Sequence, residues 1–430
     1  MDLKRVEIGK GIYLNYDRKE GHKTGLIRIL FISELDREKM SDKYVVFNVF
    51  NKSTEKYPKL IDIKRRTYEI YAPSISSRTY KHGDNSITEF NCSVFDRKYT
   101  LEDYDTTGTA IDLLEQFIFH PNLIDGKLST EIVDRVKTDA IHSIRSIKNY
   151  KNAYAQSRML RNMLGNTPYG VSDAGEVEDI AKVDCDSLYE TYQNLVKTSR
   201  IEIFAVGTFD FDYLCVKFKE MFSHIERSDI YELHTKQFIC PENTEYKKVY
   251  EQEEVNQGRL VLGFGLKSPI EEEDRVRYRV FNDIYGDGLS SRLFVNVREK
   301  LSLCYGCSSS INIVKGFLSV SAGIKFENEQ KAFDEIMRQL DDLRAGNITQ
   351  EELEVAKINE LSVLNNVENE ISSVCGWHVG EILTGHYDGI SIEKKKNDIQ
   401  AVSADDVMRQ ANNVVLNTYY FMTGKDGNNG

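Results

Sequence analysis

The sequence predicts an α+β protein made of two homologous domains of about 200 residues, each a mainly antiparallel sheet packed with helices. The main observation is that the chain repeats itself once, and the second is that short strands are segregated from long helices in each half. The first copy ends with a helical pattern at 183–196 and the strand-like RIEIFAVG at 200–207. The second copy ends with a helical pattern at 402–415 and TYYFMTG at 418–424, about 219 residues later.

The same order of elements precedes both endings: a strand, a helix and a long helical tract. We expect these elements at 86–95, 110–118 and from Ser129 to about Leu164 in the first half, and at 316–324, 331–343 and from Thr349 to about Leu383 in the second half.

A capping box, Thr349-Gln350-Glu351-Glu352, predicts where the second tract begins. The charged, proline-containing run near residue 240 predicts a linker. We therefore expect a first domain at 1–228, a linker at 229–245 and a second domain at 246–430.

The composition is typical of a globular protein, with 40% hydrophobic and 29% charged residues. A net charge of -12 argues against nucleic acid or an anionic membrane as the main partner. No stretch approaches the roughly 18 uncharged apolar residues of a membrane helix, and the N-terminus lacks a secretory signal pattern. The seven scattered cysteines predict reduced thiols. We therefore expect a cytoplasmic protein without membrane insertion.

The segment GDGLSSRLFVNVREKLSLCYG, at 286–306, carries the clearest chemical pattern. It predicts an amphipathic helix running into a strand, with Arg298 late on the helix and Tyr305 on the strand. A turn between them could bring both side chains to one surface. Arginine supplies a fixed fork of donors and tyrosine a phenolic donor. Spacing alone favours a structural interpretation, a surface arginine and an aromatic residue at the edge of the core.

This segment resembles the C-terminal-domain signature of the insulinase/pitrilysin family of zinc peptidases, in which SSRLF, VRE and Leu-x-Tyr recur in this order. Here the three elements are residues 290–294, residues 297–299, and Leu303 with Tyr305. Weaker matches extend the resemblance over nearly the whole chain, at Thr167-Pro168-Tyr169-Gly170 with Gly175, at 205–210 and at 257–266. The resemblance also implies the duplicated fold.

The first domain of that family carries the inverted zinc motif His-x-x-Glu-His, in which both histidines bind zinc and the glutamate activates water. This sequence contains no such motif. When Ser53-Thr54 is placed on the turn that follows the motif, the three slots become Tyr44, Phe47 and Asn48. The fourth slot falls within DAIHSI at 139–144, where no glutamate stands. The resemblance therefore implies a degenerate zinc site and no metal bound by this chain.

Other metal sites have little support in the sequence. No two of the eight histidines lie four residues apart, and His378-x-x-Glu381 beside Trp377 is better explained by packing. Cys304-x-x-Cys307 lacks the second pair that zinc sites usually need. On a regular strand its two sulfurs would also point to opposite faces.

Some members of the family are heterodimers in which one subunit holds zinc and the other contributes the Arg–Tyr pair. The resemblance therefore implies a non-catalytic, substrate-binding subunit whose partner is a homologous zinc-bearing subunit and whose substrate is a peptide to be processed. Arg298 would hold the peptide backbone and Tyr305 would donate to the oxyanion. Gly286, Gly288 and Ser291 would belong to the substrate-binding segment.

Two alternatives stay open at this point. The chain could be a binding or scaffold protein that uses the peptidase fold without supporting catalysis, although an intact Arg–Tyr pair counts against this. It could also be a self-sufficient enzyme with an unorthodox metal site, which the absence of paired histidines disfavours. The sequence selects neither a particular peptide nor a homodimer.

Overall fold

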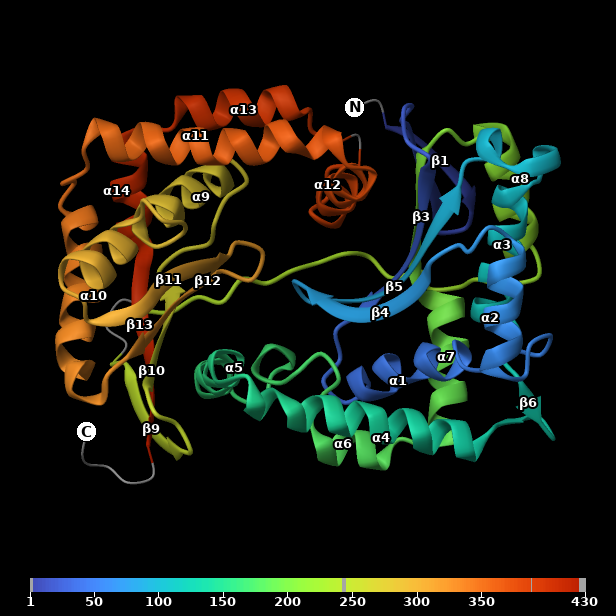
Figure 1. The fold of residues 1–430 in the computed structure, drawn as a ribbon, viewed down its shortest axis with the longest axis horizontal. Coiled ribbons are helices and arrows are strands. Elements are labelled where there is room, and N and C mark those ends of the chain that lie inside the picture. The colour runs from blue at the N-terminus through green and yellow to red at the C-terminus, as the bar shows by residue number, and fades with distance from the viewer. Residues whose placement is uncertain (1–2, 242–244, 388, 425–430) are drawn as a thin grey trace. The chain divides into compact units, whose positions relative to one another are not determined.

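The computed structural model describes residues 3–241, 245–387 and 389–424. The chain forms two compact units (Figure 1). The first comprises the described residues of Met1–Arg145, Ser172–His234 and Val367–Ile390, and the second those of Ser146–Val171, Thr235–Asn366 and Ser391–Gly430.

The described part of the first unit contains a six-stranded sheet with the order β1-β2-β8-β3-β5-β4. Its strands are β1 (Lys4–Gly9), β2 (Ile12–Arg18), β3 (Thr24–Glu34), β4 (Ile75–His82), β5 (Asn85–Phe95) and β8 (Arg200–Gly207). All neighbours pair antiparallel except β2 and β8, which are parallel. Strand β3 is buried along most of its length, as expected for a central strand covered on both faces.

The helices of the first unit are α1 (Met40–Phe50), α2 (Leu60–Glu69), α3 (Thr106–Phe119), α4 (Thr130–Ser146), α6 (Val177–Lys182), α7 (Cys185–Thr198), α8 (Phe211–Phe222) and α12 (Ile371–Leu383). Shorter elements are η1 (Arg97–Tyr99), η2 (Leu101–Asp103), η7 (Val367–Asn369) and the small hairpin β6 (Leu123–Ile124) with β7 (Lys127–Leu128). Capping carboxylates explain several helix starts, for example Asp105 at α3 and Asp210 at α8.

The described part of the second unit contains a five-stranded sheet with the order β11-β12-β10-β13-β9. Its strands are β9 (Lys247–Glu253), β10 (Gly258–Leu266), β11 (Cys304–Asn312), β12 (Phe317–Ile324) and β13 (Val414–Gly424). Its helices are α5 (Lys151–Leu164), α9 (Asp274–Tyr285), α10 (Glu329–Arg344), α11 (Gln350–Asn366), α13 (Ile392–Ala401) and α14 (Ala404–Asn413), with the π-helix η5 (Leu293–Lys300) and the turns η3 (Ile147–Asn149), η4 (Pro168–Gly170) and η6 (Phe326–Asn328).

The two sheets share one topology. Strands β2, β8, β3, β5 and β4 of the first follow the same spatial order as β9, β13, β10, β12 and β11 of the second, including one parallel pair, β2–β8 in one sheet and β9–β13 in the other. Strand β1 is an addition to the first sheet. The predicted fold class, α+β with two homologous, antiparallel-rich halves, is confirmed.

Each predicted long helical tract is two helices rather than one. The 3₁₀ turn η3 separates α4 from α5, and η7 separates α11 from α12. The second helix of each tract belongs to the other unit. Helix α5 packs Met159 and Met163 against Gly263 of β10, where an added Cβ atom would collide with the Met159 sulfur. Helix α12 packs Val374 into a cluster with β3 and β8. The predicted division into a first domain, a linker and a second domain, at 1–228, 229–245 and 246–430, stays a prediction about the homologous halves of the sequence.

In the described residues, none of the helices combines the length and the apolarity that a membrane crossing requires.

Candidate functional site

Helix α1 carries the slots where the family resemblance places zinc ligands. Phe47, in the slot of the catalytic glutamate, is only 2% exposed. Its ring packs within an aromatic cluster, with centroid distances of 4.9 Å to Phe90, 5.6 Å to Phe50, 5.7 Å to Phe31 and 6.1 Å to Tyr192. This slot is part of the hydrophobic core.

The other two slots, Tyr44 and Asn48, are joined by a hydrogen bond within helix α1. The Asn48 amide donates to the Tyr44 backbone carbonyl at 2.6 Å. Burial, with the nearby charge of Asp173, raises the pKa of Tyr44, so its phenol stays protonated. On α4, Asp139 and His142 of the fourth slot are exposed. Neither a neutral phenol, a phenyl ring nor an amide supplies the ligands that zinc prefers, so these residues do not fit the metal.

Helix α9 occupies the place in the second unit that α1 occupies in the first, directly after the equivalent strand. It carries Tyr278-Arg279-Val280-Phe281-Asn282, which matches the pattern Tyr-x-Val-Phe-Asn of residues 44–48. Tyr278 and Phe281 are fully buried. The slots of the first unit therefore hold the residue types that the second unit uses for packing.

The segment that carries Arg298 is a π-helix, η5, where the sequence predicted an ordinary amphipathic helix. The widened turn is evident at its end, where the Leu301 N–H donates to the Asn296 carbonyl at 3.2 Å. Such helices are rare and often lie at functional sites. Ser302 follows with a φ of 50°, a left-handed conformation that reverses the chain into β11.

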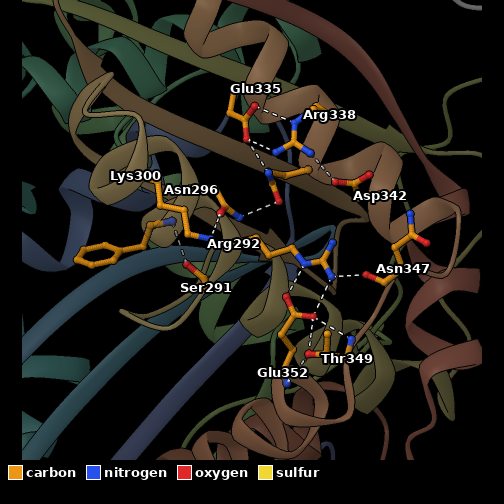
Figure 2. Close-up of polar contacts among 12 residues, drawn as sticks. Ser291, Arg292, Asn296, Lys300, Glu335, Arg338, Asp342, Asn347, Thr349 and Glu352 are labelled. Atoms are coloured by element: carbon orange, nitrogen blue, oxygen red, sulfur yellow. Dashed lines mark hydrogen bonds and ion pairs between the residues drawn. The ribbon is translucent and has the colours of Figure 1, made fainter.

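A partly buried ion pair holds the start of η5 (Figure 2). Arg292 donates through Nε to Glu352 Oε1 at 2.8 Å and through Nη2 to Glu352 Oε2 at 2.9 Å, and also to the Asn347 carbonyl. Glu352 is the third residue of α11. It accepts the Thr349 N–H at 2.9 Å and its own N–H donates to the Thr349 hydroxyl at 3.2 Å, which confirms the predicted capping box. Charged, two-pronged contacts of this kind define geometry as well as energy. They hold η5 against α11.

A second polar chain holds the middle of η5 against α10 (Figure 2). The Asn296 amide donates to Gln339 at 3.0 Å, and the Gln339 amide donates to Glu335 at 2.6 Å. Arg338 then pairs with Glu335 at 2.6 Å and with Asp342 at 2.9 Å. The π-helix is therefore supported by two neighbouring helices.

Tyr305 lies at a β-bulge in the edge strand β11. Opposite β12, Cys304 pairs with Ile324 and Gly306 pairs with Gly323, so Tyr305 is the extra residue between them. Its side chain is 63% exposed. A bulge leaves the extra residue unpaired and redirects its side chain. The phenol is thus presented to solvent at the free edge of the sheet.

Arg298 is exposed on the last turn of η5, with its guanidinium 4.4 Å from the centre of the Phe294 ring. This stacking restricts the side chain. Its charge reaches the start of β11, because it helps to lower the pKa of Cys304, the residue before Tyr305. The structure thus places both residues around the η5–β11 turn.

The other residues of the predicted substrate-binding segment occupy different environments. Gly288 has a φ of 89° and open space around it, so it suits close approach of another chain. Gly286 instead packs on Ser309, whose N–H donates to its carbonyl at 2.9 Å. Ser291 is 1% exposed, and its hydroxyl donates to the Gly288 carbonyl at 2.8 Å. In this structure Gly286 and Ser291 support the turn.

The expectation that the sulfurs of Cys304 and Cys307 point to opposite faces is wrong. The bulge adds one residue, so Cys304 lies opposite Ile324 and Cys307 opposite Ala322, two residues apart on β12. Both cysteines are consequently buried on one face. A glycine inside a strand pattern often marks a bulge, and Gly306 is the signal that could have revealed it.

His378, predicted to have a packing role, is buried on α12. Its Nε2 lies 2.8 Å from the carboxylate of Asp17 on β2, which is also buried. The contact ties α12 to the first sheet. No local pattern in the sequence indicates this partner, which is 361 positions away.

Comparison with known proteins agrees with this architecture. Residues 182–360 match the family described as Peptidase M16 inactive domain. The chain is an M16-like peptidase homologue. The homologue is similar to the probable inactive metalloprotease YmfF of Bacillus subtilis, with 25% identity over 97% of each chain. The resemblance to the insulinase/pitrilysin family is confirmed.

Solved structures share the fold of this M16-like homologue. A conserved protein from Enterococcus faecalis superimposes with a TM-score of 0.91 at 23% identity, over 100% of both chains. A protease from Helicobacter pylori gives a TM-score of 0.80 at 17% identity, over 98% of this chain and 99% of that protein. At such identities these matches establish the fold alone.

Proposed function

We propose that this M16-like homologue is the non-catalytic, substrate-binding subunit of a heterodimeric zinc peptidase. Its partner would be a homologous subunit with an intact zinc motif, and endopeptidase activity would require both chains. The observation that carries the proposal is the contrast between the two units. The slot of the catalytic glutamate on α1 holds the core residue Phe47, whereas Tyr305 is exposed beside a braced π-helix.

In this proposal Tyr305 donates its phenolic hydrogen to the oxyanion of the tetrahedral intermediate, and Arg298 holds the peptide backbone. A preorganised donor is effective because it needs no reorganisation during the reaction. The bulge and the two polar chains behind η5 supply that rigidity. Zinc in the partner would activate the attacking water.

Strand β11 offers the means of holding an extended peptide. It is the edge of its sheet, and an edge strand can accept a peptide as a further strand. Leu289 and Leu301, which flank η5, are 75% and 50% exposed and could contact apolar side chains of the substrate. In this proposal only Gly288, Arg298 and Tyr305 of the predicted residues touch the peptide, while Gly286 and Ser291 support them.

The proposed heterodimer works in the cytoplasm on short or leader-type peptides and contacts no nucleic acid. All seven cysteines are free thiols, which supports a reducing compartment. The acidic net charge of -12 argues against a polyanionic partner.

The decisive experiment mixes the chain with a homologue that carries the intact zinc motif and measures cleavage of a peptide library. We expect no cleavage by this chain alone and cleavage by the mixture. Tyr305→Phe should reduce the mixture's kcat by about 10²–10³, the usual cost of losing one oxyanion donor. Tyr68→Phe is the matched control, because Tyr68 is 78% exposed but lies on α2 of the other unit.

An unchanged rate with Tyr305→Phe would remove the proposed role of Tyr305. If the two chains associate but cleave nothing, the scaffold function is correct instead. If this chain alone binds zinc in equilibrium dialysis and cleaves peptides, the self-sufficient enzyme is correct.

A further inference from the structure

The bulge in β11 brings Cys304 and Cys307 together beneath Tyr305. Because Tyr305 is looped out, the two cysteines lie opposite residues only two apart on β12, Ile324 and Ala322. Both partners are buried, so both thiols face the interior of the second unit. Each thiol also shifts the pKa of the other.

The Cα spacing lies near the upper end of the range that disulfides span. A strand rises about 3.3 Å per residue, so positions aligned with residues two apart on the partner strand are separated by roughly 6.6 Å between Cα atoms. Disulfides span Cα distances of about 4.4–6.8 Å. Without the bulge, a separation of three residues would give roughly 10 Å and opposite faces.

The two thiols differ in a way that assigns them distinct roles. The hydrogen bond from Cys307 lowers the pKa of Cys304, burial opposes this, and the positive charge of Arg298 adds to the lowering. The same hydrogen bond, together with burial, raises the pKa of Cys307. Cys304 is also the more exposed of the two. A thiolate is the reactive form of cysteine, so Cys304 is the group that reacts first.

We propose that Cys304 and Cys307 form a redox modification site, a dithiol that peroxides convert to a disulfide under Tyr305. The Cys304 thiolate attacks one peroxide oxygen, the O–O bond breaks, and Cys304 becomes a sulfenic acid as hydroxide leaves. The Cys307 thiol then attacks the sulfenic sulfur, the S–O bond breaks, and water leaves with the Cys307 proton. One peroxide is reduced and two thiols are oxidised.

A disulfide would bridge the residues on both sides of the bulge and constrain the backbone that presents Tyr305. We expect this constraint to move the phenol, and therefore to alter cleavage by the heterodimer, a consequence that rests on the proposed function. The modification itself does not depend on that function.

The test of the modification uses the full-length chain alone. After exposure to increasing hydrogen peroxide, free thiols are alkylated and the tryptic peptide 301–315, which contains both cysteines, is weighed. We expect this peptide to lose the mass of two hydrogen atoms at peroxide doses that leave Cys185 and Cys215 open to alkylation. Those two half-buried thiols are the matched controls. Dithiothreitol should restore the original mass.

Two results would overturn the proposal. One is a peptide 301–315 in which both thiols remain open to alkylation when Cys185 and Cys215 have already been oxidised. The other is a Cys304 sulfinic acid accompanied by a free Cys307 thiol. Cys304→Ser and Cys307→Ser variants serve as further controls, since neither can lose two hydrogens from this peptide.

A second arm separates the modification from the proposed function. In an active mixture, peroxide should lower cleavage in step with the mass change, and the Cys304→Ser/Cys307→Ser double variant should keep its activity. A mass change without loss of activity contradicts only the proposed effect of the disulfide on Tyr305, and the redox site still stands. A mixture that is inactive when reduced contradicts the proposed function, while the mass change still decides the redox site.

Discussion

Helices α1 and α9 hold equivalent places in the two units and carry nearly the same five residues, YVVFN and YRVFN. In both helices the phenylalanine is buried in the core, as Phe47 and Phe281. The slots that the resemblance assigns to zinc ligands on α1 therefore carry the same residue types as the equivalent positions of α9. We therefore expect that replacing single residues on α1 would not create a metal site there.

The η5–β11 region of the second unit shows the opposite arrangement. There the supporting contacts are polar (Figure 2). The presented groups, Arg298 and Tyr305, are exposed. Polar networks within a protein cost free energy unless every group is paired. We therefore infer that the network behind η5 positions this helix and does not only stabilise the fold. The following predictions test this contrast.

The largest effect is expected from Phe47→Glu, which restores the catalytic residue type at its slot. An unpaired carboxylate within four aromatic rings should lower the free energy of unfolding by about 4 kcal/mol or more. Urea unfolding followed by circular dichroism measures this. Phe47→Leu, a milder change of volume, should cost about 1–2 kcal/mol.

Adding Tyr44→His and Asn48→His to Phe47→Glu should not create zinc affinity, because the carboxylate at position 47 would lie among four aromatic rings. A triple variant that folds as stably as the natural chain and binds zinc would show that the slots are merely vacant. The expectation that the packing around α1 prevents a metal site would then be wrong.

Arg292→Met should have the next largest effect, a loss of about 2–3 kcal/mol at pH 7, since it leaves Glu352 without its ionic partner. Burial favours a raised pKa for Glu352, but the Arg292 guanidinium and the Thr349 N–H outweigh it and hold this pKa below its usual value. A depressed carboxylate pKa stabilises the fold above the unfolded value of about 4.3 and this stability is lost as pH falls through the folded value.

The difference between the natural chain and Arg292→Met should therefore shrink below about pH 4 in urea unfolding. The control is Arg338→Met, whose side chain is 56% exposed and whose ion pairs should contribute less than about 1 kcal/mol. Equal losses of unfolding free energy in the two variants would contradict the special role of the Arg292–Glu352 pair.

Asp283→Asn on α9 should stabilise the protein at neutral pH by about 1 kcal/mol or more. Burial raises the pKa of Asp283 to about 7, although the Asn359 amide donates to it at 3.1 Å. The folded state holds this proton between about pH 4 and 7 while the unfolded state has released it, so stability falls as pH rises through that window. Asparagine keeps the acceptor and removes the dependence, which unfolding at pH 4, 6 and 8 would reveal. A destabilised variant at pH 8 would show that the carboxylate has a favourable partner.

The smallest effect on stability is expected from Tyr305→Phe, less than about 0.5 kcal/mol, because the phenol is exposed at the bulge. Its thermal midpoint should match that of the natural chain even if heterodimer activity falls. A clear loss of stability would place Tyr305 among the structural residues and weaken the contrast between the two regions.

Much of the fold could be predicted from the sequence because its signals are local. Apolar periodicity located α3, α7 and α10, and the capping box at Thr349 located the start of α11. The breaks at η3 and η7 were missed because helical spacing continues across them. What decides each break is packing against a sheet that lies far away in the chain.

The candidate site was predicted only in outline. Residue order placed Arg298 and Tyr305 near one turn, but the π-helix depends on Arg292 reaching Glu352, 60 positions later. The bulge depends on the register with β12. Such features follow from long-range pairing, which periodicity does not report.

The placement of α5 and α12 has a consequence for how the chain can be divided. Each sheet is covered by a helix that the other half of the sequence encodes, so neither half holds all the parts of its own core. A cut within 229–245 should yield two fragments that aggregate when expressed separately and assemble into the native fold when expressed together. The sequence therefore contains two homologous copies, but we expect each copy to need a helix of the other in order to fold.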